Sequence, residues 1–336
     1  MQENEATAFE KRLVFHQTGD PAQVLRLQTE CSVPQAPAAG HVRVRILAAP
    51  INPADLNTIE GTYGVKLNLP ATPGIEGCGV VEASGCSDFA PGDKVIFLRR
   101  AATWASHATV LGSSLYRLPP LIDPLQAAML KVNPATAWRL LHGFTPLAHG
   151  ETIVQNVGNS GVGRCVIQIA SGLGIRTISF VRRPQLIAEL ESLGADHVFL
   201  DDDSGHAAAK QVLGGAQAAL AFNAVGGDSA LRLMKLLREG ACHITYGAMA
   251  RQPVTVPNGM LIFRDIQVRG LWVSRWIENA RSDEVAQTYL ELATRVVTGN
   301  LVQPVDSTYS LEAFPEALTR NGATGRSGKV LFVPES

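Results

Sequence analysis

A glycine-rich turn stands near the middle of the chain, where residues 158–163 read Gly-Asn-Ser-Gly-Val-Gly. The β-prone run 152–157 precedes it, and residues 162–173 follow it with apolar side chains at helical spacing. Glycine lets the backbone turn tightly, approach a phosphate closely and pack the new helix on the sheet, while the helix N-terminus faces the anion. A second apolar run at 177–181 completes a β-α-β unit, so the stretch predicts a dinucleotide site with the diphosphate at the turn.

The residues after that second run indicate which dinucleotide is bound. A chain that prefers NAD usually carries Asp or Glu there to hold the ribose 2′-hydroxyl, whereas this chain has Arg182 and Arg183. Guanidinium groups suit a 2′-phosphate through their charge and paired donors, so the sequence favours NADPH over NADH. The alternative is that both arginines are solvated residues at a strand end.

The pattern along the chain divides it into a β-rich part and an α/β part. Short strands separated by Gly, Pro and Asp are expected at 12–15, 25–28, 41–47, 79–83, 93–97 and 106–110. A helical stretch over 124–143 leads into the α/β part, where strands at 197–200, 218–223, 241–246 and 266–272 alternate with helices at 185–193, 207–213 and 229–237. This alternation predicts a parallel sheet covered on both faces. After an amphipathic helix at 281–297, the run 328–333 again resembles the first part, so the α/β domain is predicted to be inserted into the β-rich one.

The composition bounds the class of protein. With 336 residues the chain is long enough for two domains, and 46% hydrophobic and 18% charged residues are typical of a globular protein with a large core. The net charge of −1 gives no indication of nucleic acid or an anionic membrane as partner. No apolar run reaches membrane-spanning length.

The cysteines and the first residues bear on the compartment. The five cysteines are widely scattered without a C-x-x-C, so neither a disulfide framework nor a cysteine-rich zinc lobe is indicated. Residues 1–10 carry acidic side chains and no apolar core, unlike a secretory signal or a basic presequence. The predicted compartment is therefore a reducing cytoplasm.

Several stretches of the chain resemble one superfamily of enzymes. They are Ile-Asn-Pro-Ala-Asp-Leu-Asn-Thr-Ile-Glu-Gly-Thr-Tyr-Gly at 51–64, Val-Asn-Pro-Ala-Thr-Ala-Trp at 132–138, Asn-Ser-Gly-Val-Gly at 159–163, Thr-Tyr-Gly-Ala-Met-Ala at 245–250, and Leu-Ile-Phe-Arg-Asp at 261–265 with Gly-Leu-Trp at 270–272. Over nearly its whole length the chain resembles the medium-chain dehydrogenase/reductase superfamily. Within it, these stretches are similar to the 2-enoyl thioester reductases of the trans-2-enoyl-CoA reductase group.

The resemblance implies a fold and an activity. The fold is a doubly wound parallel Rossmann sheet, an NADPH-binding domain at 131–274, inserted into a β-rich GroES-like catalytic domain made of residues 1–130 and 275–336. The activity is NADPH-dependent reduction of the carbon–carbon double bond of a small-molecule 2-enoyl thioester, with hydride added at C3 and a proton at C2. A homodimer that pairs near residues 266–272 is also implied.

The catalytic residue that the resemblance implies is Tyr63, in the Gly-Thr-Tyr-Gly stretch at 61–64. It matches the tyrosine that family members use to give a proton to C2. A phenol with an ordinary pKa of about 10 is protonated at neutral pH and can donate without special tuning. The alternative is an ordinary aromatic residue in a polar loop.

The residues at the candidate ligand positions argue against a catalytic zinc. Zinc-dependent members of the superfamily share the architecture and need about three ligands of Cys, His or carboxylate type. This chain has Asn52 and Pro53 where the first ligand, a cysteine, would stand, and Ile75 in the place of a histidine. No metal is therefore expected, and a carbonyl group must be polarised by hydrogen bonds.

The resemblance also implies contacts with the cofactor and substrate. The cofactor contacts are Asn133, Thr136, Gly158, Asn159, Ser160, Gly161, Val162, Gly163, Arg182, Arg183, Tyr246, Gly247, Met249, Leu271, Trp272 and Lys329, and the substrate pocket is Asn52, Phe263 and Trp272. Asn133 before Pro134 also suits a helix cap, and aromatic residues near strand ends are often plain core. For Lys329 the alternative is a surface lysine at a strand start.

Two rival functions stay open. The first is an NADPH:quinone oxidoreductase of the zeta-crystallin type, which has the same fold and cofactor but no need of a proton from Tyr63. The second is a non-catalytic protein that binds NADPH as a structural or regulatory ligand. A cleft that carries a tyrosine donor favours the reductase over both.

Overall fold

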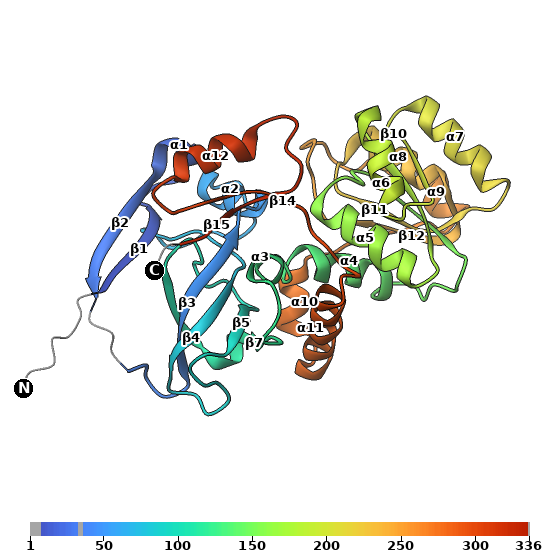
Figure 1. The fold of residues 1–336 in the computed structure, drawn as a ribbon. Coiled ribbons are helices and arrows are strands. Elements are labelled where there is room, and N and C mark those ends of the chain that lie inside the picture. The colour runs from blue at the N-terminus through green and yellow to red at the C-terminus, as the bar shows by residue number, and fades with distance from the viewer. Residues whose placement is uncertain (1–7, 33–35, 335–336) are drawn as a thin grey trace, which may run out of the picture. The chain divides into compact units, whose positions relative to one another are not determined.

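The computed structural model describes residues 8–32 and 36–334 and divides them into two compact units (Figure 1). The first unit contains the described residues up to Val132 and those from Ala280 onward, and the second is Asn133–Asn279. The chain passes from the first unit to the second after Val132 and returns to the first after Asn279. No helix in the described part of the chain has the length and apolar character needed to cross a bilayer.

The first unit is β-rich. Its strands are β1 (Ala8–Phe15), β2 (Leu25–Ser32), β3 (His41–Pro50), β4 (Cys78–Ser84), β5 (Lys94–Phe97), β6 (His107–Leu111), β7 (Leu115–Arg117), β14 (Val305–Tyr309) and β15 (Lys329–Phe332). A sheet runs in the order β14-β15-β3-β4-β5-β7, with β6 paired to β3, and β1 pairs with β2 alone. The helices of this unit are α1 (Pro21–Val24), α2 (Pro53–Glu60), α3 (Pro124–Ala128), α11 (Ser282–Val297) and α12 (Phe314–Gly322).

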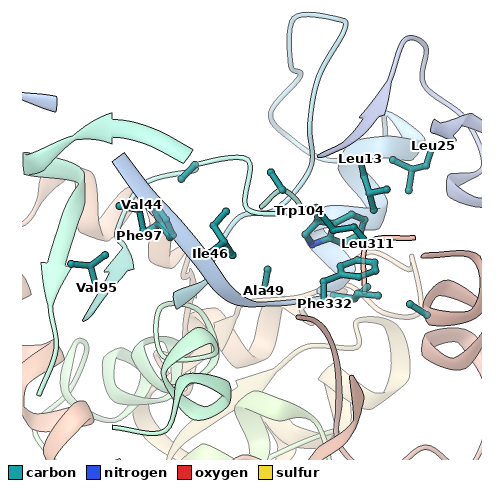
Figure 2. Close-up of a cluster of buried hydrophobic side chains, with 14 of the residues drawn as sticks. Leu13, Leu25, Val44, Ile46, Ala49, Val95, Phe97, Trp104, Leu311 and Phe332 are labelled. Atoms are coloured by element: carbon teal, nitrogen blue, oxygen red, sulfur yellow. The ribbon is translucent and has the colours of Figure 1, made fainter. Parts of the chain in front are cut away.

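The core of this unit joins the two ends of the chain. Along β3, Val42, Val44 and Ile46 are buried and alternate with more exposed residues, because successive side chains of a strand point to opposite faces. Trp104 packs edge-on against Phe332 of β15 with ring centroids 5.0 Å apart (Figure 2). Since β15 pairs antiparallel with β3, the last described strand completes a core that begins near the N-terminus.

The second unit is an α/β domain built on a six-stranded sheet in the order β10-β9-β8-β11-β12-β13. All of its pairings are parallel. The strands are β8 (Thr152–Gln155), β9 (Arg176–Val181), β10 (His197–Leu200), β11 (Ala218–Asn223), β12 (Leu237–Thr245) and β13 (Gln267–Gly270). From β8 the order runs to one side as β9 and β10 and to the other as β11, β12 and β13. The topological switch point therefore lies between β8 and β11, where doubly wound folds bind their ligands.

The second unit contains seven α-helices in its described residues, of which the first precedes β8, the last follows β13 and the others connect successive strands. They are α4 (Asn133–His142), α5 (Gly161–Gly172), α6 (Ile187–Ser192), α7 (Asp203–Leu213), α8 (Gly227–Lys235), α9 (Asn258–Ile262) and α10 (Val273–Asn279). Within β9, Ile178 and Phe180 belong to one buried cluster and Val181 to another. Adjacent side chains point to opposite faces, so the sheet is buried on both faces, as the alternating pattern predicts.

One sequence-based expectation was wrong in detail. The single helix expected over 124–143 is two helices, α3 and α4, with a break between Ala128 and Asn133. Proline lacks an N–H and disfavours helical backbone at the residue before it, so a helix starts well at Asn133-Pro134 but does not run through it. Tyr63 lies in a loop, as expected, and the helix α2 directly precedes that loop.

Candidate active site

The glycine-rich turn leads from β8 into α5. Val157 adopts the left-handed region with φ +43°, an uncommon conformation for a β-branched residue and one that is found at functional turns. Ser160 caps α5 by accepting a hydrogen bond from the N–H of Gly163 at 3.1 Å. The first N–H groups of a helix have no intrahelical acceptor, so those of Gly161 and Val162 suit an anionic oxygen.

Each glycine of the turn is required by a different neighbour. A Cβ on Gly158 would lie 2.8 Å from Cβ of Ser179 on β9, and one on Gly163 would lie 2.6 Å from the carbonyl oxygen of Gly158. A Cβ on Gly161 would meet the side-chain amide of Asn133 at 2.5 Å. The structure thus places Asn133, at the start of α4, directly against the turn. Thr136, one turn further along α4, is buried as well. A turn of closely packed glycines that leads into a helix N-terminus fits a dinucleotide diphosphate.

A pair of buried asparagines, which sequence reasoning missed, spans the switch point. Asn156 Nδ2 donates to Asn223 Oδ1 at 2.8 Å, and Asn156 Oδ1 accepts from the N–H of Ala224 at 2.8 Å. Both side chains are fully buried. The available signal was an asparagine at the carboxyl end of each of two apolar runs, which places polar groups where ligands bind.

The loop after β12 lies beside this pair. The N–H groups of Tyr246 and Met249 donate to the carbonyl oxygens of Asn223 and Ala224 at 2.9 and 2.8 Å. A Cβ on Gly247 would approach Cβ of Ala224 to 3.1 Å, so glycine allows the loop to lie close to β11. Burial raises the pKa of the Tyr246 hydroxyl, and the Ser160 side chain opposes that rise. The loop and the glycine-rich turn are therefore neighbours at the switch point.

The remaining predicted contacts of this unit are more exposed. Arg182 and Arg183 are both exposed directly after β9. Leu271 donates its N–H to Thr245 at 3.0 Å, and the guanidinium of Arg275 lies 5.6 Å from the ring centroid of Trp272. Phe263, which was expected in the substrate pocket, is 79% exposed. The arginines have the position and freedom from burial that a 2′-phosphate contact needs.

In the first unit, Tyr63 follows the C-terminus of α2. Gly61 adopts the left-handed region with φ +78° and ends the helix, as glycine commonly does. The N–H groups of Thr62 and Tyr63 both donate to the carbonyl oxygen of Asn57, at 2.9 and 3.0 Å. Tyr63 is half-buried and is fixed to the end of α2 through its backbone.

The positions considered for zinc ligands carry a different set of groups. The Asn52 amide donates to Glu76 Oε1 at 2.7 Å and accepts from the ammonium of Lys329, while Ile75 is apolar and buried. Within residues 8–32 and 36–334, no three His, Cys, Asp or Glu side chains gather closely enough to hold a metal ion. A catalytic zinc needs Cys, His or carboxylate ligands. An isoleucine cannot serve as one, and the nitrogen and oxygen of the Asn52 amide already have hydrogen-bond partners. Lys329, expected near the cofactor, donates to the Asn52 side chain and to the carbonyl oxygen of Ile51, the latter at 3.3 Å.

Comparisons with known proteins cover the same two units. Residues 38–113 match the alcohol dehydrogenase GroES-like domain, and residues 161–295 match the zinc-binding dehydrogenase family. The chain is 42% identical over 332 residues to the mitochondrial enoyl-[acyl-carrier-protein] reductase of Xenopus tropicalis, covering 96% of this chain and 94% of that protein.

Solved structures are similar over nearly the whole length. Etr1p, solved with NADP and crotonyl-CoA, gives a TM-score of 0.87 at 28% identity, covering 97% of this chain and 100% of that one. The Etr1p/Etr2p heterodimer, a mitochondrial 2-enoyl thioester reductase from Candida tropicalis, gives 0.86 with the same identity and coverage. A Bacillus thuringiensis protein described as an NADPH:quinone reductase gives 0.90 at 25% identity, covering 98% and 100%.

Proposed function

Because the chain belongs to the enoyl-[acyl-carrier-protein] reductases of the medium-chain dehydrogenase/reductase superfamily, we propose that it reduces the carbon–carbon double bond of 2-enoyl thioesters with NADPH. The observation that carries the proposal is the 42% identity along 332 residues, a length that covers 96% of the chain. NADPH supplies the hydride for C3. The chain must supply the proton for C2 and stabilise the charge that develops on the thioester oxygen.

Tyr63 is the proposed proton donor. Its backbone is held at the end of α2, while its side chain is half-buried. Proton donation to C2 converts the enolate formed by hydride addition into the saturated thioester, so atoms and charge balance without a metal. A positioned general acid typically contributes a factor of about 10² to 10⁴.

The cofactor is assigned to residues of the second unit. The diphosphate lies on the N–H groups at Gly161 and Val162, and the 2′-phosphate lies on Arg182 and Arg183. The further proposed contacts are Asn133, Thr136, Gly158, Asn159, Ser160, Gly163, Tyr246, Gly247, Met249, Leu271 and Trp272, with Lys329 of the first unit. Asn133 against Gly161 supports this assignment, because it brings two parts of the proposed site together.

The deciding experiment measures NADPH oxidation with crotonyl-CoA and with an ortho-quinone, for the native protein and for Tyr63→Phe. We expect crotonyl-CoA to be reduced and the substitution to slow it by a factor of about ten or more. Reaction with the quinone alone, unchanged by the substitution, would establish the quinone reductase that the Bacillus thuringiensis structure suggests. Tight NADPH binding with no acceptor would identify a binding protein.

The partner is proposed to be a second copy of the chain. β13 lies at the edge of the six-stranded sheet, and its four residues are all exposed, including Val268. An unpaired edge offers N–H and C=O groups to another strand, and a charged side chain there opposes pairing. Light scattering should give a dimer for the native protein and a monomer for Val268→Lys. Val212→Lys, an equally exposed valine on α7, is the matched control. A monomeric native protein at micromolar concentration refutes the proposal.

The cytoplasm is the proposed compartment. Scattered cysteines without a C-x-x-C suit a reducing environment. The curated relatives are named as mitochondrial proteins, so the test is cell fractionation that separates cytoplasm from mitochondria. Recovery with the mitochondrial fraction overturns the assignment.

A further inference from the structure

The hydrogen bonds around Asn223 allow its side chain only one orientation. Its amide oxygen accepts from the N–H groups of Val225 and Gly226 at 3.0 and 3.1 Å, and from the amide nitrogen of Asn156 at 2.8 Å. An amide nitrogen cannot accept a hydrogen bond, so these donors must face the oxygen. The Asn223 nitrogen therefore points the other way, where it donates to the hydroxyl of Thr245 at 3.1 Å.

The Asn156 amide is fixed from both ends as well. Its oxygen accepts from the N–H of Ala224 at 2.8 Å, and its nitrogen also donates to the hydroxyl of Ser229 at 2.9 Å. Ser229 gives its own proton to the Asp201 carboxylate at 2.6 Å, and that carboxylate forms an ion pair with Arg232. Turning either amide over would leave backbone N–H groups without their acceptor, which costs free energy. The row of hydrogen bonds therefore has one direction.

This direction leaves the Thr245 hydroxyl with a proton to give. A hydroxyl has one proton and two lone pairs, and the bond from Asn223 uses one of the lone pairs. Within residues 8–32 and 36–334, the proton of this hydroxyl makes no hydrogen bond, although the side chain is half-buried. The structure thus presents Thr245 as a donor.

Thr245 lies at the carboxyl end of β12, between two stretches assigned to the cofactor. Tyr246 is the next residue, and the N–H of Leu271 donates to the Thr245 carbonyl oxygen at 3.0 Å. Arg182 and Arg183, assigned to the 2′-phosphate of the adenosine half, follow β9 on the other side of the switch point between β8 and β11. With the diphosphate at the switch point, the β12 side is left for the nicotinamide half.

We propose that Thr245 is a cofactor-binding residue, whose hydroxyl donates a hydrogen bond to an acceptor oxygen of the nicotinamide half of NADPH. The inference rests on the proposed function, since it needs the dinucleotide to bind along this edge of the sheet. The acceptors of that half are the carboxamide oxygen and the ribose oxygens. Asn223 holds the hydroxyl as a donor, so the site is prepared for an acceptor before the cofactor arrives.

The test replaces Thr245 by Val, which has about the same shape without the hydroxyl, and by Ser, which keeps it. The matched control is Thr177→Val, because Thr177 lies on β9 of the same sheet and its buried hydroxyl has no hydrogen-bond partner among the described residues. Kd is measured for NADPH and for 2′,5′-ADP, which carries the adenosine half alone. Urea unfolding without cofactor measures the stability of each variant.

We expect Thr245→Val to raise Kd for NADPH by about three- to tenfold, as the loss of one hydrogen bond does, and to leave Kd for 2′,5′-ADP within about twofold. The substitution also removes the acceptor of the Asn223 amide, so the midpoint of urea unfolding should fall. Thr245→Ser should bind NADPH nearly as the native protein does, because its hydroxyl can make both bonds. Thr177→Val should bind both ligands with native affinity.

Three results would overturn the inference. Native affinity for NADPH in Thr245→Val shows that the hydroxyl makes no contact with the cofactor. An equal rise in Kd for NADPH and 2′,5′-ADP shows a general disturbance of the site. A loss in Thr245→Ser as large as that in Thr245→Val shows that the methyl group matters and the hydroxyl does not. Thr245→Ala removes the same hydroxyl and gives the same comparison where Thr245→Val folds poorly.

Failure of the proposed function has a different signature. A native protein that does not bind NADPH refutes the cofactor assignment itself, whatever the variants do. A native protein that binds NADPH but does not reduce crotonyl-CoA refutes the reductase, while the comparison of NADPH with 2′,5′-ADP still decides the role of Thr245.

Discussion

Asn156 and Asn223 join the carboxyl ends of β8 and β11 through a buried hydrogen bond of 2.8 Å from one side-chain amide to the other. The bond crosses the point at which the strand order reverses. The Asn223 oxygen also accepts from the N–H groups of Val225 and Gly226, at 3.0 and 3.1 Å. One amide pair therefore shapes the turns after two strands, and the glycine-rich turn begins two residues after Asn156.

Asn156→Ala should lower the free energy of unfolding and weaken NADPH binding. The substitution leaves the buried N–H of Ala224 without its acceptor, which costs about 1–3 kcal/mol. Urea unfolding and fluorescence titration with NADPH measure the two effects. Gln217→Ala removes an exposed amide of the same unit and is the control, with an expected change within roughly 0.5 kcal/mol. Equal stability of the two variants would contradict the structural role of Asn156.

Replacing Arg182 and Arg183 together by alanine should remove the preference for NADPH. A hydrogen bond to a charged group contributes about 1.5–3 kcal/mol, so Kd for NADPH should rise by a factor of about ten to a hundred. Kd for NADH should stay the same, because NADH has no 2′-phosphate. Arg176→Ala, an exposed arginine at the other end of β9, is the matched control. A parallel rise in Kd for both cofactors would show that the arginines do not read the 2′-phosphate.

Gly163→Ala should distort the phosphate turn. The added methyl group would lie 2.6 Å from the carbonyl oxygen of Gly158 and 2.7 Å from that of Val157, and backbone atoms cannot rotate aside as a side chain can. Overpacking of this kind costs about 1–3 kcal/mol of stability, so we expect a Tm several degrees lower. Because the distorted backbone is the one that faces the diphosphate, NADPH binding should weaken by about tenfold or more. Gly322→Ala, where an added methyl group meets nothing within 4 Å, should leave both unchanged. Native NADPH affinity in Gly163→Ala would rule out the close approach at this turn.

The stability of the native protein should fall as the pH rises through the neutral range. Burial raises the pKa of Asp55 to about 6 and that of Glu76 to about 7, and the ammonium of Lys329 opposes both rises. The folded protein thus holds these protons more tightly than the unfolded chain does. Their stabilising contribution is complete below the ordinary carboxyl values and is lost as the pH rises through about 6 and then about 7.

Glu76→Gln tests this dependence. The amide cannot ionise but keeps an oxygen to accept a hydrogen bond, so Tm should decline less between pH 5 and pH 8 than in the native protein. Glu82→Gln, a partly exposed carboxylate on β4 in the same unit, is the control and should follow the native curve. Identical slopes for native protein and Glu76→Gln would contradict the raised pKa of Glu76.

The sequence predicted those elements whose burial follows a local pattern. The strands at 197–200 and 218–223 were predicted with the bounds that the structure gives, because each is an apolar run between polar or glycine residues. The predicted insertion of one domain in the other rests on the same patterns. The glycine-rich turn and the arginines after β9 could be found because the spacing of the motif reflects local geometry.

The missed features depend on partners that are distant in the sequence. α2 contains Asp55 and Thr58, which are polar but buried, so its apolar periodicity is weak. Their burial becomes understandable only with Ile75 and Arg100, which supply the matching donors at 2.9 and 3.3 Å. The same holds for Lys329, whose position next to Asn52 follows from the pairing of β15 with β3. The roles of the individual site residues stay predictions.

The strand β15 has a consequence for how the protein is made. Residues 133–279 form a unit from one continuous stretch, so all of its strands have left the ribosome before the first unit has received β14, β15 and Lys329. Domains generally fold as units during synthesis. The nucleotide-binding unit can therefore fold first. At that stage Phe332, which packs against Trp104, and Lys329, which donates to Asn52, have not yet been synthesised. A chain stalled after residue 279 would thus carry a finished glycine-rich turn beside a β-rich unit that still lacks two strands, so the nucleotide-binding unit would be complete before the core around Trp104.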